Sequence, residues 1–164
     1  QGCLRFREDD FMDSAKGIPT KTRSRLTLIG RKREGKFEHE VLLSRSRFLA
    51  PATNSLRFYR EYFIPTTEVT IEKDRLRWFI KYKDTEFYVN LDNVTTPALG
   101  YFLEIKSRTW SRSDAESKAQ VVNELITFLG TSPAETVAQD YVEIAEKSGE
   151  AAHPDHAAHQ DHAA

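Results

Sequence analysis

Apolar and polar residues alternate with a period of two along most of the first 110 residues. Seven short segments show this alternation and are rich in β-branched and aromatic side chains: residues 3–8, 23–29, 36–43, 66–72, 75–83, 85–92 and 100–108. Because successive side chains of a strand point to opposite faces of its sheet, these segments are expected to form β-strands. Residues 55–63 fit either a short helix or a strand.

In the last third of the chain the apolar residues recur at intervals of three and four, which is the spacing of one helix face. The helix is expected to begin with the capping box Ser113–Glu116 and to stop at Gly130, with its apolar face packed on the sheet. Residues 132–135 repeat the start signal for a shorter helix. Residues 140–146 fit either a strand or a helix.

These elements predict one α+β, mainly β domain over residues 1–147, with one or two carboxy-terminal helices packed outside the sheet. Trp110 and Tyr141 are expected to belong to its core. Residues 148–164 contain a six-residue repeat of histidine, alanine and acidic residues and lack large apolar side chains. This segment is expected to be a disordered tail.

The string EKDRLRWF places three cations on one face of its strand. Lys73, Arg75 and Arg77 occupy alternate positions, while Leu76 and Trp78 point the other way. One interpretation is a sheet with a solvent-exposed face, on which arginines pair loosely with carboxylates. The other is a functional surface, because the same charge pattern recurs elsewhere in the sequence.

Five further segments carry ionic residues at alternate positions: Arg5 and Arg7, Arg23 and Arg25, Glu38 and Glu40, Arg45 and Arg47, and Glu104, Lys106 and Arg108. If the strands close into an antiparallel barrel with these residues inside, guanidinium groups line the lumen and repel one another unless an anion is bound. The arginine fork binds phosphate oxygens in pairs and stays charged at any working pH. The pattern therefore predicts a polyphosphate guest, with the carboxylates holding its divalent metal.

Composition adds a charge gradient to this picture. The formal net charge is −1, but residues 1–48 carry +5, residues 49–112 carry +2 and residues 113–164 carry −8. A basic body with an acidic end favours an anionic ligand for the body. Cys3 is the only cysteine, so an internal disulfide is impossible and a reducing, cytoplasmic setting is expected.

The sequence also limits the classes of partner and chemistry. No apolar run is long enough to span a membrane and no secretory signal is present, so no membrane partner is expected. No nucleophile elbow, P-loop or zinc-ligand spacing occurs, so these three chemistries have no support. The first residue is glutamine, and we expect a longer protein with further residues, or a fused domain, upstream.

Four strings of the sequence resemble, in order, the signatures of the CYTH or triphosphate tunnel metalloenzyme family. They are LRFRED at residues 4–9, LTLIG at 26–30, EKDRLRW at 72–78 and YVNLDNVTTPALGYFLEIKSR at 88–108. The last string is the most specific, because it repeats many positions of one family segment, namely Leu91, Asp92, Leu99, Gly100, Phe102, Glu104 and Ile105. The resemblance covers roughly residues 3–145.

The resemblance implies an antiparallel β tunnel that binds a triphosphate group with Mg²⁺ or Mn²⁺. Members of the family hydrolyse inorganic, thiamine or RNA 5′-triphosphates, and some cyclise ATP. The resemblance assigns phosphate contacts to Arg5, Arg7, Lys73 and Arg75, of which Lys73 and Arg75 are the expected catalytic pair. With the charge pattern, the expected substrate-binding set extends to Arg25, Arg45, Arg47, Arg77 and Lys106. The implied metal-side residues are Glu104, Asp92, Glu38 and Glu40.

The sequence departs from the family pattern at three places. It lacks the amino-terminal E-x-E-x-K strand, and it has Ile29 where the family has a lysine and Lys106 where the family has a second glutamate. An ammonium group at a metal-side position disfavours metal binding but leaves polyanion binding intact.

Several functions stay open at this point. One is a metal-dependent triphosphatase or cyclase, and another is a non-catalytic module that binds polyphosphate or nucleotides. A third is a polyphosphate polymerase-like tunnel, to whose E-x-K pair the string LEIK is similar. The expected partner is a small-molecule triphosphate or polyphosphate. Nucleic acid is expected only as an RNA 5′-triphosphate end.

Overall fold

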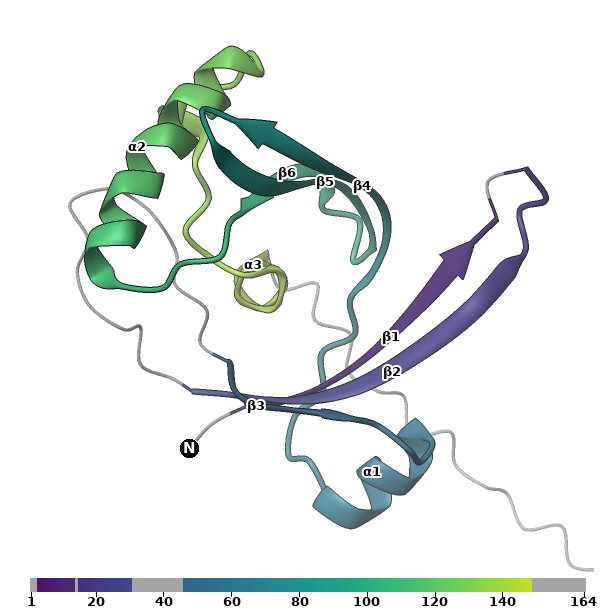
Figure 1. The fold of residues 1–164 in the computed structure, drawn as a ribbon. Coiled ribbons are helices and arrows are strands. Elements are labelled where there is room, and N and C mark those ends of the chain that lie inside the picture. The colour runs from purple at the N-terminus through teal and green to yellow at the C-terminus, as the bar shows by residue number, and fades with distance from the viewer. Residues whose placement is uncertain (1–2, 14, 31–45, 149–164) are drawn as a thin grey trace, which may run out of the picture. The chain divides into compact units, whose positions relative to one another are not determined.

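The computed structural model describes residues 3–13, 15–30 and 46–148, which form two compact units (Figure 1). The first unit contains strands β1–β3 and helix α1. The second contains strands β4–β6, helices α2 and α3 and the 3₁₀ helix η1. Each unit has its own three-stranded antiparallel sheet.

The sheet of the first unit separates arginines from apolar residues. Arg7 lies directly opposite Arg25, and Leu4 lies directly opposite Leu28. Because opposite partners share a face, arginines gather on one side of the sheet and leucines on the other, as the alternation predicts. The three strands are, in spatial order, β1 (Cys3–Met12), β2 (Pro19–Ile29) and β3 (Ser46–Pro51).

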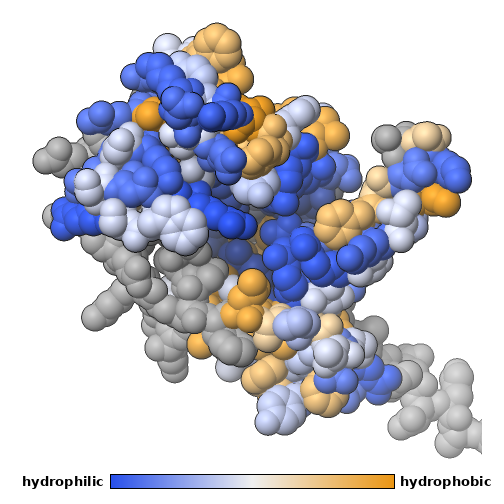
Figure 2. Space-filling view, in the orientation of Figure 1, coloured by the Kyte–Doolittle hydropathy of each residue, from blue (hydrophilic) through white to orange (hydrophobic). Residues whose placement is uncertain are grey.

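Helix α1 (Leu56–Phe63) resolves the segment that fitted either a helix or a strand. Ser55 caps it, because the serine hydroxyl accepts a hydrogen bond from the Phe58 amide at 3.5 Å. The Tyr59 ring lies 5.7 Å from the Phe6 ring, so the helix packs on the apolar face of its sheet. Other aromatic residues of α1 are exposed, and Figure 2 shows hydrophobic side chains on the surface of this helix.

The sheet of the second unit is a meander of three antiparallel strands: β4 (Glu72–Tyr82), β5 (Thr85–Thr96) and β6 (Gly100–Lys106). Lys83 and Asp84 connect β4 to β5 in a two-residue turn, and both have the positive φ that such turns favour, 46° and 58°. This tight turn fixes the register of the hairpin, and the register decides which face each side chain occupies.

One face of the second sheet is apolar and carries the core of the unit. Val89 of β5 lies opposite Trp78 on one side and Ile105 on the other. Leu125 of helix α2 (Arg112–Phe128) is buried against Val89. The expected amphipathic helix packed on a sheet is therefore present.

The strand expected at residues 66–72 is absent apart from its last residue. β4 begins at Glu72, which pairs with Thr96 at the end of β5. Residues 66–71 precede this pairing and belong to no strand, and no partner strand pairs with them in the part of the chain that the structure describes. The strand expected at residues 36–43 lies outside the described residues.

Helix α2 begins two residues earlier than the predicted capping box. Its N-cap is Ser111, not Ser113, and the Ser111 hydroxyl accepts a hydrogen bond from the Asp114 amide at 3.1 Å. The next two predicted elements are a single 3₁₀ turn, η1 (Pro133–Glu135), and an α-helix, α3 (Tyr141–Ser148).

Trp110 is 83% exposed, so its predicted place in the core is wrong. It directly precedes Ser111, the N-cap of α2, and its amide donates to the Asp114 carboxylate at 2.9 Å. The predicted tail also needs a new boundary, because Ser148 is the last residue of α3. Residues 149–164 lie outside the described residues.

The α+β, mainly β class is confirmed by the two antiparallel sheets and the helices that accompany them. Over residues 3–13, 15–30 and 46–148 the strands do not form a closed barrel. In the same ranges, the helices are too short or too polar to cross a membrane. The single domain over residues 1–147 stays a prediction.

Candidate functional site

Basic side chains line the face of the β4–β5–β6 sheet that does not carry the core. Lys73, Arg75 and Arg77 alternate along β4, as the sequence predicts. The register places Arg75 opposite Asp92 and Arg77 opposite Asn90, so these residues share one face. On β6, Glu104 is opposite Asn90 in turn. We call this surface the ionic face: Lys73, Arg75, Arg77, Asn90, Asp92, Glu104 and Lys106.

Asp92 lies at the centre of the ionic face and is 0% exposed. Lys73 Nζ donates to its Oδ2 at 2.6 Å, and Arg75 donates through Nε to Oδ1 and through Nη2 to Oδ2, both at 2.6 Å. The Tyr141 hydroxyl of α3 adds a hydrogen bond to Oδ2 at 2.7 Å. The buried carboxylate is thus paired and hydrogen-bonded, as burial of a charge requires.

Glu104 forms the second carboxylate of the ionic face. Its Oε2 accepts hydrogen bonds from Arg75 Nη2 at 2.8 Å and from Asn90 Nδ2 at 3.0 Å, and its Oε1 lies 2.7 Å from Lys106 Nζ. Arg77 joins the network through Asn90, since its Nε donates to the amide oxygen at 2.7 Å. Arg75 therefore bridges the two carboxylates, and Asn90 links Arg77 to Glu104.

Electrostatics within this network fix which groups are charged. Burial alone favours the neutral form of Asp92, but hydrogen bonds from Arg75 and Lys73 hold the pKa of that carboxyl well below its usual range. Burial, together with the hydrogen bond to Asp92, raises the pKa of Tyr141, so its hydroxyl remains a donor. Burial lowers the pKa of Lys73, and the adjacent Arg75 charge acts in the same direction.

Two members of the network were missed by sequence reasoning. Asn90 had a usable signal, because it precedes Asp92 by two residues on β5 and must share its face. Tyr141 was expected in the core, yet its hydroxyl contacts Asp92 and its ring lies 4.4 Å from Lys73 Nζ. The position of Tyr141 depends on how α3 packs on the sheet, and the local sequence pattern does not predict this packing.

The ionic face has more positive than negative charge. Lys73, Arg75, Arg77 and Lys106 face two carboxylates, which leaves a net charge of about +2. Arg75 Nη1 is buried and has no hydrogen-bond partner among the described residues. An unpaired buried donor costs about 1–3 kcal/mol. An anion at this face would offset the excess charge.

The first unit holds a separate arginine cluster. Arg7, Arg23 and Arg25 all contact Asp9, at N···O distances of 2.5, 3.2 and 2.8 Å. Burial opposes ionisation of Asp9, but the hydrogen bond and charge of Arg7 lower the pKa of this carboxyl. Arg25 Nε is buried without a hydrogen-bond partner in the described ranges. Asp9 was not predicted, although it shares the face of Arg7 by alternation.

The predicted site residues are described for each unit by itself. The structure brings together six of them on the ionic face: Lys73, Arg75, Arg77, Asp92, Glu104 and Lys106. Arg7 and Arg25 meet in the first unit, where Arg5 lies on the same strand face opposite Thr27. Arg47 lies on β3. The remaining three lie outside the described residues: Arg45, Glu38 and Glu40.

The carboxylates of the ionic face are committed to cations. Both oxygens of Asp92 and both oxygens of Glu104 contact ammonium or guanidinium groups. No group of three or more metal-ligating side chains occurs in the described part of the chain. A divalent ion needs oxygen ligands that are not held by competing cations, so Asp92 and Glu104 in this arrangement do not offer such ligands. The other two predicted metal-side residues, Glu38 and Glu40, lie outside the described residues.

Comparison with known proteins adds no relative. The chain matches no family model, and no curated protein or solved structure is significantly similar to it. Function therefore has to be inferred from the chemistry of the site itself.

Proposed function

We propose that the ionic face binds the triphosphate group of a phosphorylated compound, as the resemblance to the CYTH family implies. The observation that supports this most is the excess of cations around the buried Asp92, a net charge of about +2 on one face of a three-stranded sheet. Like charges held together favour an anionic ligand, and arginine forks match phosphate oxygens.

Asp92 positions the two cations that the resemblance makes catalytic. Lys73 and Arg75 are hydrogen-bonded to this buried carboxylate, so their orientation is set before a ligand arrives. Arg77 bonds a neutral amide oxygen, and the Lys106 side chain is 54% exposed. Arg77 and Lys106 can therefore turn toward phosphate oxygens at less cost than the two anchored cations.

The arginine cluster of the first unit is part of the same proposal. Arg7 and Arg25 oppose each other across β1 and β2, with Arg5 at the next position on that face. The resemblance assigns phosphate contacts to Arg5 and Arg7. Their shared face with Arg25 supports this expectation for the first unit taken by itself.

Hydrolysis of the bound triphosphate is the reaction that the resemblance implies, with Mg²⁺ or Mn²⁺ as the metal. In phosphoryl transfer, positioned cations stabilise the charge on the transferred group, and Lys73 and Arg75 are the residues placed for this role. One observation favours the alternative of a non-catalytic binding module, because Asp92 and Glu104 are both held by cations.

Binding is tested by isothermal titration calorimetry with inorganic triphosphate. Arg77→Gln and Lys106→Gln are each expected to weaken binding about tenfold or more, because each removes a charged hydrogen-bond donor worth about 1.5–3 kcal/mol. Arg112→Gln is the control, since the Arg112 side chain is 76% exposed on α2 and pairs with Glu116. Equal weakening in all three variants, or no binding by the wild type, would refute the assignment.

Turnover is tested by phosphate release from inorganic triphosphate, ATP and thiamine triphosphate, with and without Mg²⁺ or Mn²⁺. Metal-dependent release supports the hydrolase. Saturable binding without release from any of the three supports the binding module instead.

A further inference from the structure

Two exposed aromatic side chains continue the ionic face beyond Arg77. Phe79 follows Arg77 by two positions on β4, so it lies on the same side of the sheet, and its register partner is Tyr88 on β5. Phe79 is 57% exposed and Tyr88 is 37% exposed, and their ring centres lie 5.2 Å apart. We call Phe79 and Tyr88 the aromatic pair.

Cations adjoin the aromatic pair on two sides. Lys106 of β6 is the register partner of Tyr88, and its side chain is 54% exposed. The Arg77 guanidinium lies over the Tyr88 ring, 5.8 Å from the ring centre. Successive rows of side chains on one sheet face are about 7 Å apart, because that is the rise of two strand residues. The aromatic pair is therefore one row away from Arg77, at the edge of a face with a net charge of about +2.

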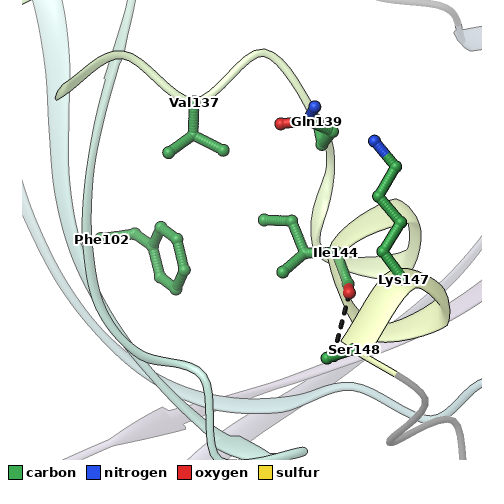
Figure 3. Close-up of a pocket in the computed structure, with 6 residues that line it drawn as sticks. All are labelled: Phe102, Val137, Gln139, Ile144, Lys147 and Ser148. Carbon is green, nitrogen blue, oxygen red and sulfur yellow. Dashed lines mark hydrogen bonds between the residues drawn. The ribbon is translucent and has the colours of Figure 1, made fainter. Parts of the chain in front are cut away.

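The other aromatic rings on this side of the sheet are packed within the unit. Phe102 is the register partner of Asp92, and its ring shares a space with the Val137 and Ile144 side chains (Figure 3). The Phe102 ring also lies 5.1 Å from that of Tyr141, whose hydroxyl donates to Asp92. Among the described residues of this sheet face, the aromatic pair thus holds the rings that are open to a ligand.

Exposed rings beside cations on a sheet face have the chemistry that binds single-stranded nucleic acid. The bases of a single strand are free to stack on aromatic side chains, and its phosphates contact lysine and arginine. In a duplex the bases stack on one another and are not free to do so. The carboxylates of an acidic peptide would contact the cations but gain nothing from the exposed rings. The aromatic pair therefore favours a strand of nucleotides over other polyanions.

We propose that the aromatic pair and the ionic face together bind single-stranded nucleic acid. Bases stack on Phe79 and Tyr88, and the phosphates next to these bases contact Arg77 and Lys106. Such a ligand needs no triphosphate group. The inference thus goes beyond the proposed function, and beyond the RNA 5′-triphosphate end that the sequence predicts.

The test is fluorescence anisotropy of the full chain with labelled single strands of about 12 nucleotides, a length within the usual range of site sizes. RNA and DNA strands that end in a 5′-hydroxyl group are the probes. An abasic strand of the same length keeps the phosphates but has no bases to stack. It is expected to bind about tenfold more weakly than at least one base-bearing strand, because base stacking contributes to affinity at each stacked position.

Phe79→Leu and Tyr88→Leu are each expected to weaken binding of the base-bearing strand about fivefold or more, because leucine has no π face. Neither change is expected to alter the affinity for the abasic strand. Phe79→Trp is expected to retain the wild-type affinity, since an indole ring also stacks on bases. Trp78→Leu is the matched control and is expected to have no effect, because Trp78 is 47% exposed on the same strand but lies on the opposite face.

Salt dependence separates the phosphate contacts from the stacking. For a single strand, each phosphate contact adds about 0.7 to the steepness with which log K falls against log salt concentration. Arg77→Gln is expected to reduce this steepness by about 0.7, while Phe79→Leu leaves it unchanged. An unchanged steepness in Arg77→Gln overturns the phosphate contact assigned to Arg77.

The outcomes also separate this inference from the proposed function. It is overturned if the abasic strand, a duplex of the same sequence or an acidic peptide of the same charge binds as tightly as the base-bearing strand. Equal losses in Phe79→Leu and Trp78→Leu, or no binding of any strand, overturn it too. If a leucine variant does not fold, the comparison of base-bearing and abasic strands on the wild type decides. None of these results bears on inorganic triphosphate, whose binding is measured separately by calorimetry.

Discussion

Asp92 is the residue on which the arrangement of the ionic face depends. It is 0% exposed and accepts hydrogen bonds from Lys73, Arg75 and Tyr141. Removing one partner of a buried ion pair is strongly destabilising, because the remaining charge stays buried without a counter-ion. The same carboxylate holds the two cations in place, so stability and phosphate binding both depend on it.

Asp92→Asn is expected to lower the free energy of unfolding by roughly 3–5 kcal/mol, measured by urea denaturation at neutral pH. The asparagine keeps the shape of the side chain but leaves Lys73 and Arg75 without a carboxylate. Asp84→Asn is the control, because the Asp84 side chain is 96% exposed, and its effect is expected within about 0.5 kcal/mol. Similar losses in both variants would contradict a buried Asp92.

Acid is expected to destabilise the wild type through the same residue. Although burial opposes ionisation, hydrogen bonds from Arg75 and Lys73 hold the pKa of Asp92 below its ordinary value, so the unfolded chain takes up this proton at a higher pH than the folded chain. The contribution of Asp92 is complete above the unfolded pKa, about 4, and is lost as pH falls from there toward the folded pKa. As pH falls below about 4, the free energy of unfolding of Asp92→Asn should therefore decrease less than that of the wild type. The same dependence on pH in both proteins would contradict this expectation.

Arg75 is expected to be less replaceable by lysine than Arg77. The Arg75 guanidinium contacts Asp92 and Glu104 through two nitrogens, a geometry that a lysine ammonium does not reproduce. Arg75→Lys should cost about 1.5–3 kcal/mol, and Arg77→Lys about 0.5–1.5 kcal/mol because its acceptor is the neutral Asn90 amide. Urea denaturation of both variants measures the difference, and a larger loss for Arg77→Lys would reverse this ranking.

The residues of the ionic face were partly predictable because a strand has a period of two. Alternation alone assigns Lys73, Arg75 and Arg77 to one side of their strand, and they lie there in the fold. The same alternation places Asn90 on the face of Asp92, but a search for charged side chains does not select a neutral residue. Tyr141 was not predictable, since it reaches Asp92 from a helix 49 residues later in the chain.

At the scale of elements, the start of α2 shows the limit of local signals. Ser111 and Ser113 each have an acidic residue three positions later, so both fit the capping-box pattern. In the structure the cap is Ser111. Its hydroxyl accepts a hydrogen bond from the Asp114 amide, and the Asp114 carboxylate accepts one from the Trp110 amide. Two overlapping boxes cannot be ranked by sequence alone.

Ser111→Ala is expected to destabilise the second unit by about 1 kcal/mol through loss of this cap. Ser113→Ala is the matched control and is expected to be nearly neutral, because Ser113 lies inside the helix. Thermal unfolding followed by circular dichroism compares the two. If Ser113→Ala lost more stability than Ser111→Ala, Ser113 would be the N-cap, as the sequence predicted.

Among the described residues, strands were predicted well where a partner strand is present and poorly where none is. Residues 75–83 and 85–92 form the β4–β5 hairpin, whose two-residue turn fixes the pairing. Residues 66–71 have a similar alternating pattern but lie before Glu72, the residue at which β4 begins to pair with β5. Alternation reports which face a side chain prefers, and pairing decides whether a strand forms.

At the scale of the whole molecule, the mainly β class followed from composition and alternation, but strand order did not. Each sheet pairs strands that are consecutive in sequence, which local patterns favour. Closure into a tunnel requires pairing between distant strands, which neither alternation nor charge can determine. The metal stays a prediction: the sequence identifies carboxylates, while the ion-pair partners of Asp92 and Glu104 become known only in three dimensions.

The most direct test of triphosphate binding on the ionic face is a nitrogen-15 NMR titration of the full chain with inorganic triphosphate. Saturable shifts are expected in the Nε–H signals of Arg75 and Arg77 and in the backbone amides around Asp92 and Glu104, with little change on the exposed side of α2. Shifts that spare these signals, or that follow exposed charged residues in general without saturation, would contradict a phosphate site on this sheet.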